Sequence, residues 1–340
     1  QLDWPGKRAA AFAANAPVAK TLRPVREESV DFDTTKNLFI EGDNLDVLKL
    51  LQESYLGKVK LIYIDPPYNT GNDFIYDDDF AESVESYLSA SGQSDSDGVR
   101  LVANTESNGR FHSSWLSMMY PRLRLARTLM SEDGAIFVSI GDDEQPSLRR
   151  MLDEVFGEQN FLASIARVTK RSSNNGTHYA SGKDYVLVYA RNAETLPGFS
   201  TPLSEEQIKG FNRTDEAGAY KEIGLYQAAL KHGGSIYPIT CPDGSRVLPP
   251  GTVPWRWSEA TLKAGLDKNL IVFKQTTTSP LVDADSGEQS TWNIYTKLYL
   301  KDRLADGMVP KDFIEDAQNN IASRELKALD IPFDFPKPVA

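Results

Sequence analysis

The apolar run from Lys58 to Ile64 (KVKLIYI) limits the fold most, because Asp-Pro-Pro follows it directly. A short run rich in β-branched and aromatic residues is typical of a strand that is covered on both faces. The two prolines end it, because they cannot continue a strand ladder. Gly134 to Ile140 (GAIFVSI) has the same character. The sequence therefore predicts two buried strands of the kind found in parallel sheets.

Helical segments alternate with these strands. We predict helices at Asn44–Glu53, Ser113–Met130 and Glu144–Phe156, and a further short strand at Asn37–Glu41. The second helix carries an apolar stripe of Leu116, Met119, Leu123 and Ala126. Strands that alternate with helices predict an α/β fold with a doubly wound, mostly parallel sheet. In such sheets ligands bind beyond the carboxyl ends of the strands.

The composition of the sequence changes near Ala193, where prolines and glycines cluster and apolar runs become shorter. We therefore predict a first domain over residues 1–192 and a second, mixed α+β domain over residues 193–329.

Charge and composition exclude several classes of protein. The formal net charge of −11 excludes a protein that coats nucleic acid through overall positive charge, although Ile165–Arg191 is locally basic. One cysteine, Cys241, and three histidines give no cluster for zinc, so we expect no metal site and a reducing, cytoplasmic setting. No apolar run approaches the ~20 residues of a membrane span.

The motif Asp65-Pro66-Pro67-Tyr68 carries the clearest chemistry. Its prolines hold the turn extended and remove two backbone donors, which leaves carbonyl groups at the rim of the sheet. The Asp65 carboxylate and the Pro66 carbonyl can accept both hydrogens of a planar exocyclic amine, and Tyr68 can stack on its ring. On these four residues alone, a strand-ending turn with a capping acid stays an open alternative.

Five segments around and beyond this motif resemble one family. They are Asn37–Tyr76, Gly109–Glu144, Phe156–Phe161, Tyr237–Ser258 and Phe333–Ala340. In this order they resemble the modification (methyltransferase) subunits of type III restriction-modification systems. The resemblance implies a permuted, Rossmann-like methyltransferase core of the beta class in residues 1–192 and a target-recognition domain in residues 193–329. It also implies S-adenosylmethionine-dependent methylation of adenine N6 in double-stranded DNA, with the base flipped out of the duplex.

The resemblance assigns roles to individual residues. It places Asp65, Pro66, Pro67 and Tyr68 at the target base and the transferred methyl group. The cofactor would be bound by Asp43, Asp65 and Lys337. Without the resemblance, Gly42-Asp43-Asn44 indicates only a turn and a helix cap, and Lys337 a flexible terminal lysine.

The resemblance breaks after the second domain. Residues 330–340 are similar to the start of the family's C-terminal cofactor-binding part, in which a Phe-x-Gly-x-Gly loop holds the methionine portion of the cofactor. No such sequence occurs in these residues. We therefore expect the chain by itself to be truncated, to hold half of the cofactor site and to be inactive.

A hairpin is predicted at Arg167–Tyr189, and in the family such a hairpin borders the target-base pocket. The predicted DNA-binding residues of the chain are Lys170, Arg171, Asn174, Asn175, Lys183 and Arg256. A solvated hairpin tip is an equally good interpretation of the first five. In Trp255-Arg256-Trp257, the spacing favours a core position for at least one tryptophan ring.

The resemblance also implies partners, namely double-stranded DNA, a restriction (helicase-nuclease) subunit and a second copy of the chain. Two other functions stay open at this point. One is cytosine-N4 methylation, although serine commonly replaces the first aspartate of the motif there. The other is a DNA-binding specificity module with an incomplete catalytic half.

Overall fold

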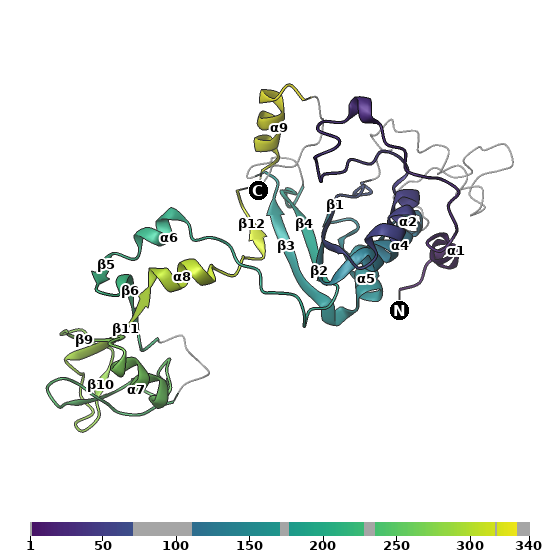
Figure 1. Ribbon diagram of the computed structural model, residues 1–340. Coiled ribbons are helices and arrows are strands. Elements are labelled where there is room, and N and C mark those ends of the chain that lie inside the picture. Colours follow the sequence, from purple (N-terminus) through teal and green to yellow (C-terminus); the bar gives the residue numbers. More distant parts are fainter. Residues whose placement is uncertain (1, 71–110, 171–176, 228–234, 317, 332–340) are drawn as a thin grey trace. The chain divides into compact units, whose positions relative to one another are not determined.

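A computed structural model describes residues 2–70, 111–170, 177–227, 235–316 and 318–331 (Figure 1). The chain forms two compact units, of which the first contains Gln1–Pro197 together with Lys311–Ala340 and the second Gly198–Pro310. The expected boundary at residue 329 differs from this division. Residues 311–329 belong to the first unit, because strand β12 (Phe313–Ile314) pairs with β3 (Phe161–Val168) of that unit.

The first unit is built around one five-stranded sheet with the order β1-β2-β4-β3-β12. Its other strands are β1 (Val59–Ile64), β2 (Met130–Ile140) and β4 (Lys183–Ala190). Its helices are α1 (Lys7–Ala13), α2 (Asn44–Tyr55), α4 (Phe111–Leu129), α5 (Gln145–Phe156) and α9 (Asn319–Ala328), with short 3-10 turns at Arg26–Glu28 and Glu158–Asn160.

Four strands of this sheet run in the same direction. β1 is parallel to β2 and β3 is parallel to β12, while β4 is antiparallel to both of its neighbours. Only β4 therefore runs the opposite way. The predicted α/β class with a mostly parallel sheet is confirmed.

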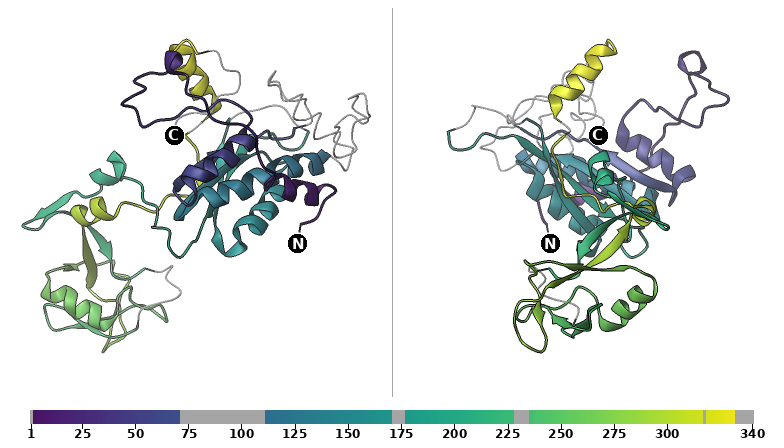
Figure 2. Two further views of the ribbon diagram at one scale, coloured as in Figure 1. Left: turned by 45° about the vertical axis from the view of Figure 1, so that its right-hand side comes forward. Right: turned by 90° about the vertical axis from the view of Figure 1, so that its left-hand side faces the viewer.

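The core of the first unit lies between the sheet and helices α4 and α5. Leu116, Met119, Leu123 and Ala126 are buried as predicted. They pack with Ile136, Val138 and Ile140 of β2 and with Leu148, Met151, Leu152 and Phe156 of α5. Helices α2, α4 and α5 lie next to one another (Figure 2). Among the described residues, no helix is long and apolar enough to cross a membrane.

Two expectations near β1 are wrong. The segment 37–41 forms no strand, and Leu38 and Phe39 are 70% and 93% exposed. A strand needs a neighbour for its backbone hydrogen bonds, and within the described residues β1 pairs only with β2. Nor is β1 covered on both faces, since Ile62 and Ile64 pack on the core but Leu61 and Tyr63 are 60% and 53% exposed.

The two faces of the sheet separate two sets of side chains on β4. Tyr185, Leu187 and Tyr189 point to the core that contains α4 and α5, which we call the core face. Because side chains alternate along a strand, Asp184 points to the other side, which we call the opposite face. Tyr63 also lies there, where its hydroxyl is 2.7 Å from the Ser139 hydroxyl.

The second unit contains two antiparallel sheets, with the orders β5-β6-β11-β9 and β10-β8-β7. Its strands are β5 (Arg213–Asp215), β6 (Gly218–Gly224), β7 (Ile239–Thr240), β8 (Arg246–Leu248), β9 (Ile271–Gln275), β10 (Val282–Asp283) and β11 (Trp292–Tyr299). Its helices are α6 (Glu205–Lys209), α7 (Glu259–Asp267) and α8 (Leu300–Asp306). Trp255 is fully buried in its core and Trp257 packs against that core, as the spacing favoured.

Candidate functional site

The Asp65-Pro66-Pro67-Tyr68 loop begins where β1 ends, at the carboxyl edge of the sheet. Ile64 pairs with Val138 of β2, so the ends of these two parallel strands lie at the same edge. The loop exposes Asp65 and buries Pro66. An acid is thereby presented at the edge where ligands of such sheets bind.

Two hydrogen bonds, from Trp115 and to Glu144, hold the loop in place. The Trp115 indole nitrogen of α4 donates to the Pro67 carbonyl at 2.7 Å. Asn69 turns the chain away in a left-handed conformation with φ 57°, which asparagine tolerates. Its side-chain amide donates to Glu144 Oε1 at 2.6 Å. The loop is therefore held on both sides of Tyr68.

Glu144 is a fully buried carboxylate at the N-terminus of α5. Its Oε1 also lies 2.6 Å from His112 Nδ1, while its Oε2 has no hydrogen-bond partner among the described residues. A buried carboxylate is costly unless its neighbours compensate. Glu144 thus joins the start of α4, the start of α5 and the end of the loop.

Tyr68 is fixed at both ends of its side chain. Its hydroxyl donates to Asp184 Oδ2 at 3.2 Å, and its ring lies against Gly141, where an added Cβ would be 3.1 Å from Tyr68 Cδ2. Burial, followed by the charges of Asp184 and Asp65, raises the pKa of Tyr68 above its ordinary value. The phenol therefore stays protonated and acts as a donor.

Asp184 is held in turn by Arg167, its direct cross-strand partner on β3. Arg167 Nε donates to Oδ1 at 2.8 Å and Nη2 donates to Oδ2 at 2.5 Å. Burial lowers the pKa of Arg167, but the hydrogen bonds and charge of Asp184 outweigh it and raise the pKa overall. Arg167 lies in the segment Ile165–Arg191, whose basic character predicts a charged surface residue at this position. It is instead a buried and neutralised base.

The predicted cofactor residues are placed differently from one another. Asp43 is the N-cap of α2, where Oδ1 accepts from the Asp46 amide at 3.0 Å, and its Oδ2 lies 3.7 Å from Arg122 Nη2. Burial lowers the pKa of Arg122, and the charges of Asp43 and Asp46 oppose that shift. Lys337 lies outside the described residues.

Of the predicted DNA-binding residues, Arg171, Asn174 and Asn175 lie outside the described residues. Lys170 is exposed just after β3. Arg256 donates from Nη1 to the Gly224 carbonyl at 3.2 Å, so part of its guanidinium stabilises the second unit.

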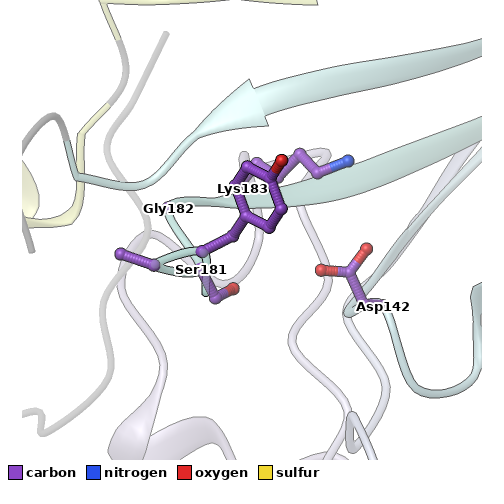
Figure 3. Close-up of a pocket in the computed structure, with 6 residues that line it drawn as sticks. Asp142, Ser181, Gly182 and Lys183 are labelled. Atoms are coloured by element: carbon purple, nitrogen blue, oxygen red, sulfur yellow. The ribbon is translucent and has the colours of Figure 1, made fainter. Parts of the chain in front are cut away.

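Lys183 lines an open hollow of about 470 Å³ at the start of β4. The other lining residues are Asp142, Tyr179, Ala180, Ser181 and Gly182. Figure 3 shows the Asp142 carboxylate and the Ser181 hydroxyl turned toward this space. The Lys183 ammonium donates to the Tyr185 hydroxyl, and this bond raises the pKa of Lys183. The hollow therefore combines one cation, one carboxylate and neutral polar groups.

Several residues of this site were not predicted from sequence, among them Asn69, Trp115, Glu144 and Asp184. Asp184 did carry a signal, because it is the single acid in a basic hairpin. Trp115 and Glu144 act from helices far along the chain and carry no local signal. Among the described residues, no group of three or more His, Cys, Asp or Glu side chains is arranged to hold a metal ion.

Known proteins are similar in sequence to much of this chain. Residues 59–273 match the family model N6_N4_Mtase, described as DNA methylase. The type III restriction-modification enzyme StyLTI Mod subunit of Salmonella typhimurium is 36% identical over 80% of this chain and 42% of its own length. The EcoP15I Mod subunit of Escherichia coli is 42% identical over 57% of this chain and 31% of its own length.

A third relative, the type II methyltransferase M.EcaI of Enterobacter cloacae, is 28% identical over 77% of this chain and 52% of its own length. The chain spans less than half the length of the two type III subunits. The family match covers more than half of the chain and begins with β1, the strand that presents the Asp65–Tyr68 loop. The chain therefore belongs to the DNA methylase family, with type III modification subunits among its relatives.

Proposed function

We propose that the chain is the catalytic and target-recognising part of an S-adenosylmethionine-dependent DNA adenine-N6 methyltransferase. It would act as the modification and specificity subunit of a type III restriction-modification system. The single observation that carries the proposal is the exposed Asp65 carboxylate beside Tyr68 at the carboxyl end of β1, in a member of the DNA methylase family.

The chemistry follows from the loop. The Asp65 carboxylate and the Pro66 carbonyl accept the two hydrogens of the adenine amine, which directs its nitrogen lone pair away from the ring. The Pro67 carbonyl is already engaged by Trp115, so Pro66 supplies the second acceptor. Asp65 stabilises the positive charge that develops on nitrogen and accepts the departing proton. Tyr68 packs against the flipped base.

S-adenosylmethionine supplies an electrophilic methyl group when bound. The exposed carboxylate of Asp65 fits the ammonium or hydroxyl donors of such a ligand. Asp43 fits less well, because it already caps α2 and faces Arg122. We propose Asp65, Asp43 and Lys337 as cofactor residues, and Asp65 is the one of them that the structure exposes at the carboxyl edge of the sheet.

The hollow at the start of β4 supports a nucleotide at this edge. It is lined by Asp142, which follows Gly141 directly, and by Lys183, which precedes Asp184. Lys170 and Lys183 would contact phosphates, and a flipped nucleotide would bring its sugar and phosphate into this neighbourhood.

Asp65→Ala in the full-length protein should abolish methyl transfer and largely spare DNA binding, since phosphate contacts supply most of the affinity. Transfer of tritiated methyl groups and fluorescence anisotropy of labelled duplex measure the two properties. Asp133→Ala is the matched control, because Asp133 pairs with Lys60 away from this loop. Near-normal methylation by the Asp65 variant would overturn the proposal.

Two further results distinguish the alternatives. Mass spectrometry of digested product DNA should find N6-methyladenine, and N4-methylcytosine would instead assign the cytosine reaction. Sequence-specific DNA binding without any methyl transfer by the unaltered protein would assign a specificity module.

The same proposal includes a restriction subunit and a second copy of the chain as partners. The names of the type III relatives, which are subunits of restriction-modification enzymes, support the restriction subunit. The second copy is proposed from the resemblance in sequence alone. Light scattering after size exclusion should give twice the monomer mass for the full-length protein. A monomer that binds its DNA site normally would overturn the dimer.

A further inference from the structure

A hydrogen-bonded network connects Tyr68 to three segments that are distant in sequence. Its hydroxyl donates to Asp184 on β4, and Asp184 accepts two hydrogen bonds from Arg167 on β3. Arg167 Nη1 also donates to Asn319 Oδ1 at 2.9 Å, at the start of α9. The backbone N–H of Asn319 donates to the Thr169 carbonyl at 3.1 Å, which fixes the start of α9 beside the end of β3.

The ion pair in this network is buried, with both side chains only 7% exposed. Removing two charges from water is expensive, and an apolar pair of similar volume is often as stable or more stable. Stability alone therefore gives little reason for an ion pair at this position. Its distinctive property is that it fixes the orientation of Asp184, because Arg167 binds both carboxylate oxygens and one of them also accepts the hydrogen bond from the Tyr68 hydroxyl.

The network leaves the Tyr68 ring little freedom. The hydroxyl end is bound to Asp184 and the ring lies against Gly141. On either side of Tyr68, Trp115 binds the Pro67 carbonyl and Glu144 binds the Asn69 side chain. A glycine at position 141 is what permits this approach, since a side chain there would press on the ring.

We infer that Asp184 and Arg167 are positioning residues for methyl transfer, which they serve by fixing the Tyr68 ring against the flipped base. This inference rests on the proposed function. Neither residue touches the reacting atoms. Both act through the Tyr68 hydroxyl, and a displaced ring would misplace the target amine relative to Asp65. Misplacement of about 1 Å can cost about 100-fold in rate.

Two variants separate positioning from stability. Asp184→Asn keeps an oxygen that accepts from Tyr68 but breaks the ion pair, so it should lower stability and retain most of kcat. The double variant Arg167→Met with Asp184→Leu removes both charges, so it should fold well yet lose about 10- to 100-fold in kcat with unchanged DNA affinity. If the two residues had a purely structural role, activity would follow stability. The less stable Asp184→Asn variant would then be less active than the double variant.

A matched control exists in the same unit. Asp153 accepts from the Tyr189 hydroxyl and from Arg149, but on the core face of the sheet. Asp153→Asn should therefore change stability and leave kcat unaltered. Tyr68→Phe added to the double variant should cause no further loss, because the hydroxyl no longer has its acceptor. An additive loss would show that the hydroxyl acts elsewhere and overturn the inference.

The spectroscopic test places 2-aminopurine at the target position of the duplex. A flipped 2-aminopurine that stacks on Tyr68 is quenched, so fluorescence should rise in the double variant and stay low in Asp153→Asn. The inference is overturned if fluorescence and kcat are unchanged in the double variant. The proposed function still stands in that case, provided that Asp65→Ala abolishes methylation. If Asp65→Ala is also active, the proposed function itself fails.

Discussion

Two networks of the same three residue types lie on opposite faces of β4. On the core face, Tyr189 donates to Asp153 at 2.5 Å and Arg149 donates to the same carboxylate at 3.1 Å. On the opposite face, Asp184 and Arg167 repeat this arrangement with the hydroxyl of Tyr68, whose side chain also packs against the core. The chemistry is the same, but the surroundings are not.

The ion pair of the core-face network is local and partly solvated. Arg149 and Asp153 are one helical turn apart on α5, with side chains 30% and 27% exposed. The opposite-face network instead joins segments 116 residues apart and excludes water from its ion pair. The difference teaches that one interaction type can secure a helix in one place and, in our proposal, position the Tyr68 side chain in another.

The largest expected difference concerns the arginines. Arg167→Ala leaves the buried Asp184 carboxylate unpaired and should lower the free energy of unfolding by about 3–5 kcal/mol. Arg149→Ala removes a partly exposed pair and a contact with the Phe161 ring, and should cost about 1–2 kcal/mol. Urea unfolding measures both. Equal losses would mean that burial does not distinguish the networks.

The two tyrosines should respond alike to high pH. Burial is the main cause that raises the pKa of both Tyr68 and Tyr189, so their phenols stay protonated in the folded protein when unfolded tyrosine ionises near pH 10. Stability is therefore full below about pH 10 and should fall above it, by about 1.4 kcal/mol per pH unit for each tyrosine. Tyr68→Phe and Tyr189→Phe should each flatten this decline by the same amount in unfolding titrations. A flatter decline in only one variant would contradict the parallel.

At neutral pH the two substitutions should differ in function alone. Each removes one hydrogen bond to a carboxylate and should cost about 1 kcal/mol of stability. Only Tyr68→Phe should slow methyl transfer in the full-length protein. Slower transfer by Tyr189→Phe would show that the core face also contributes to the reaction.

The smallest effect concerns cations beside the opposite-face network. Lys170 and Lys183 are exposed, whereas Arg167 is buried, so we expect phosphate contacts from the two lysines and none from Arg167. Alanine at either position should lower the slope of log affinity against log salt by about 0.9 and weaken binding to all sequences equally. Alanine at both Lys170 and Arg171 should lower it by about twice as much. Salt titrations on specific and non-specific duplexes check this, with Arg149→Ala as the control.

The sequence by itself determined the parts of the fold that depend on local patterns. The stripe on α4, the strand β2 and the end of α5 at Gly157 follow from periodicity and helix-stop signals, because these forces act between residues close along the chain. The position of the Asp65–Tyr68 loop follows in the same way from the prolines after β1.

Only the tertiary structure decided which partners this loop receives. The segment 37–41 has the composition of a strand, but a strand depends on a neighbour that local sequence does not specify. Arg167 counts as a basic surface residue in the sequence and becomes a buried partner of Asp184 once the β3–β4 register is set. Tyr68 meets Asp184, and Asn69 meets Glu144, across 116 and 75 residues. Contacts of that range exist only after the sheet has assembled, because strand order and register bring the groups together.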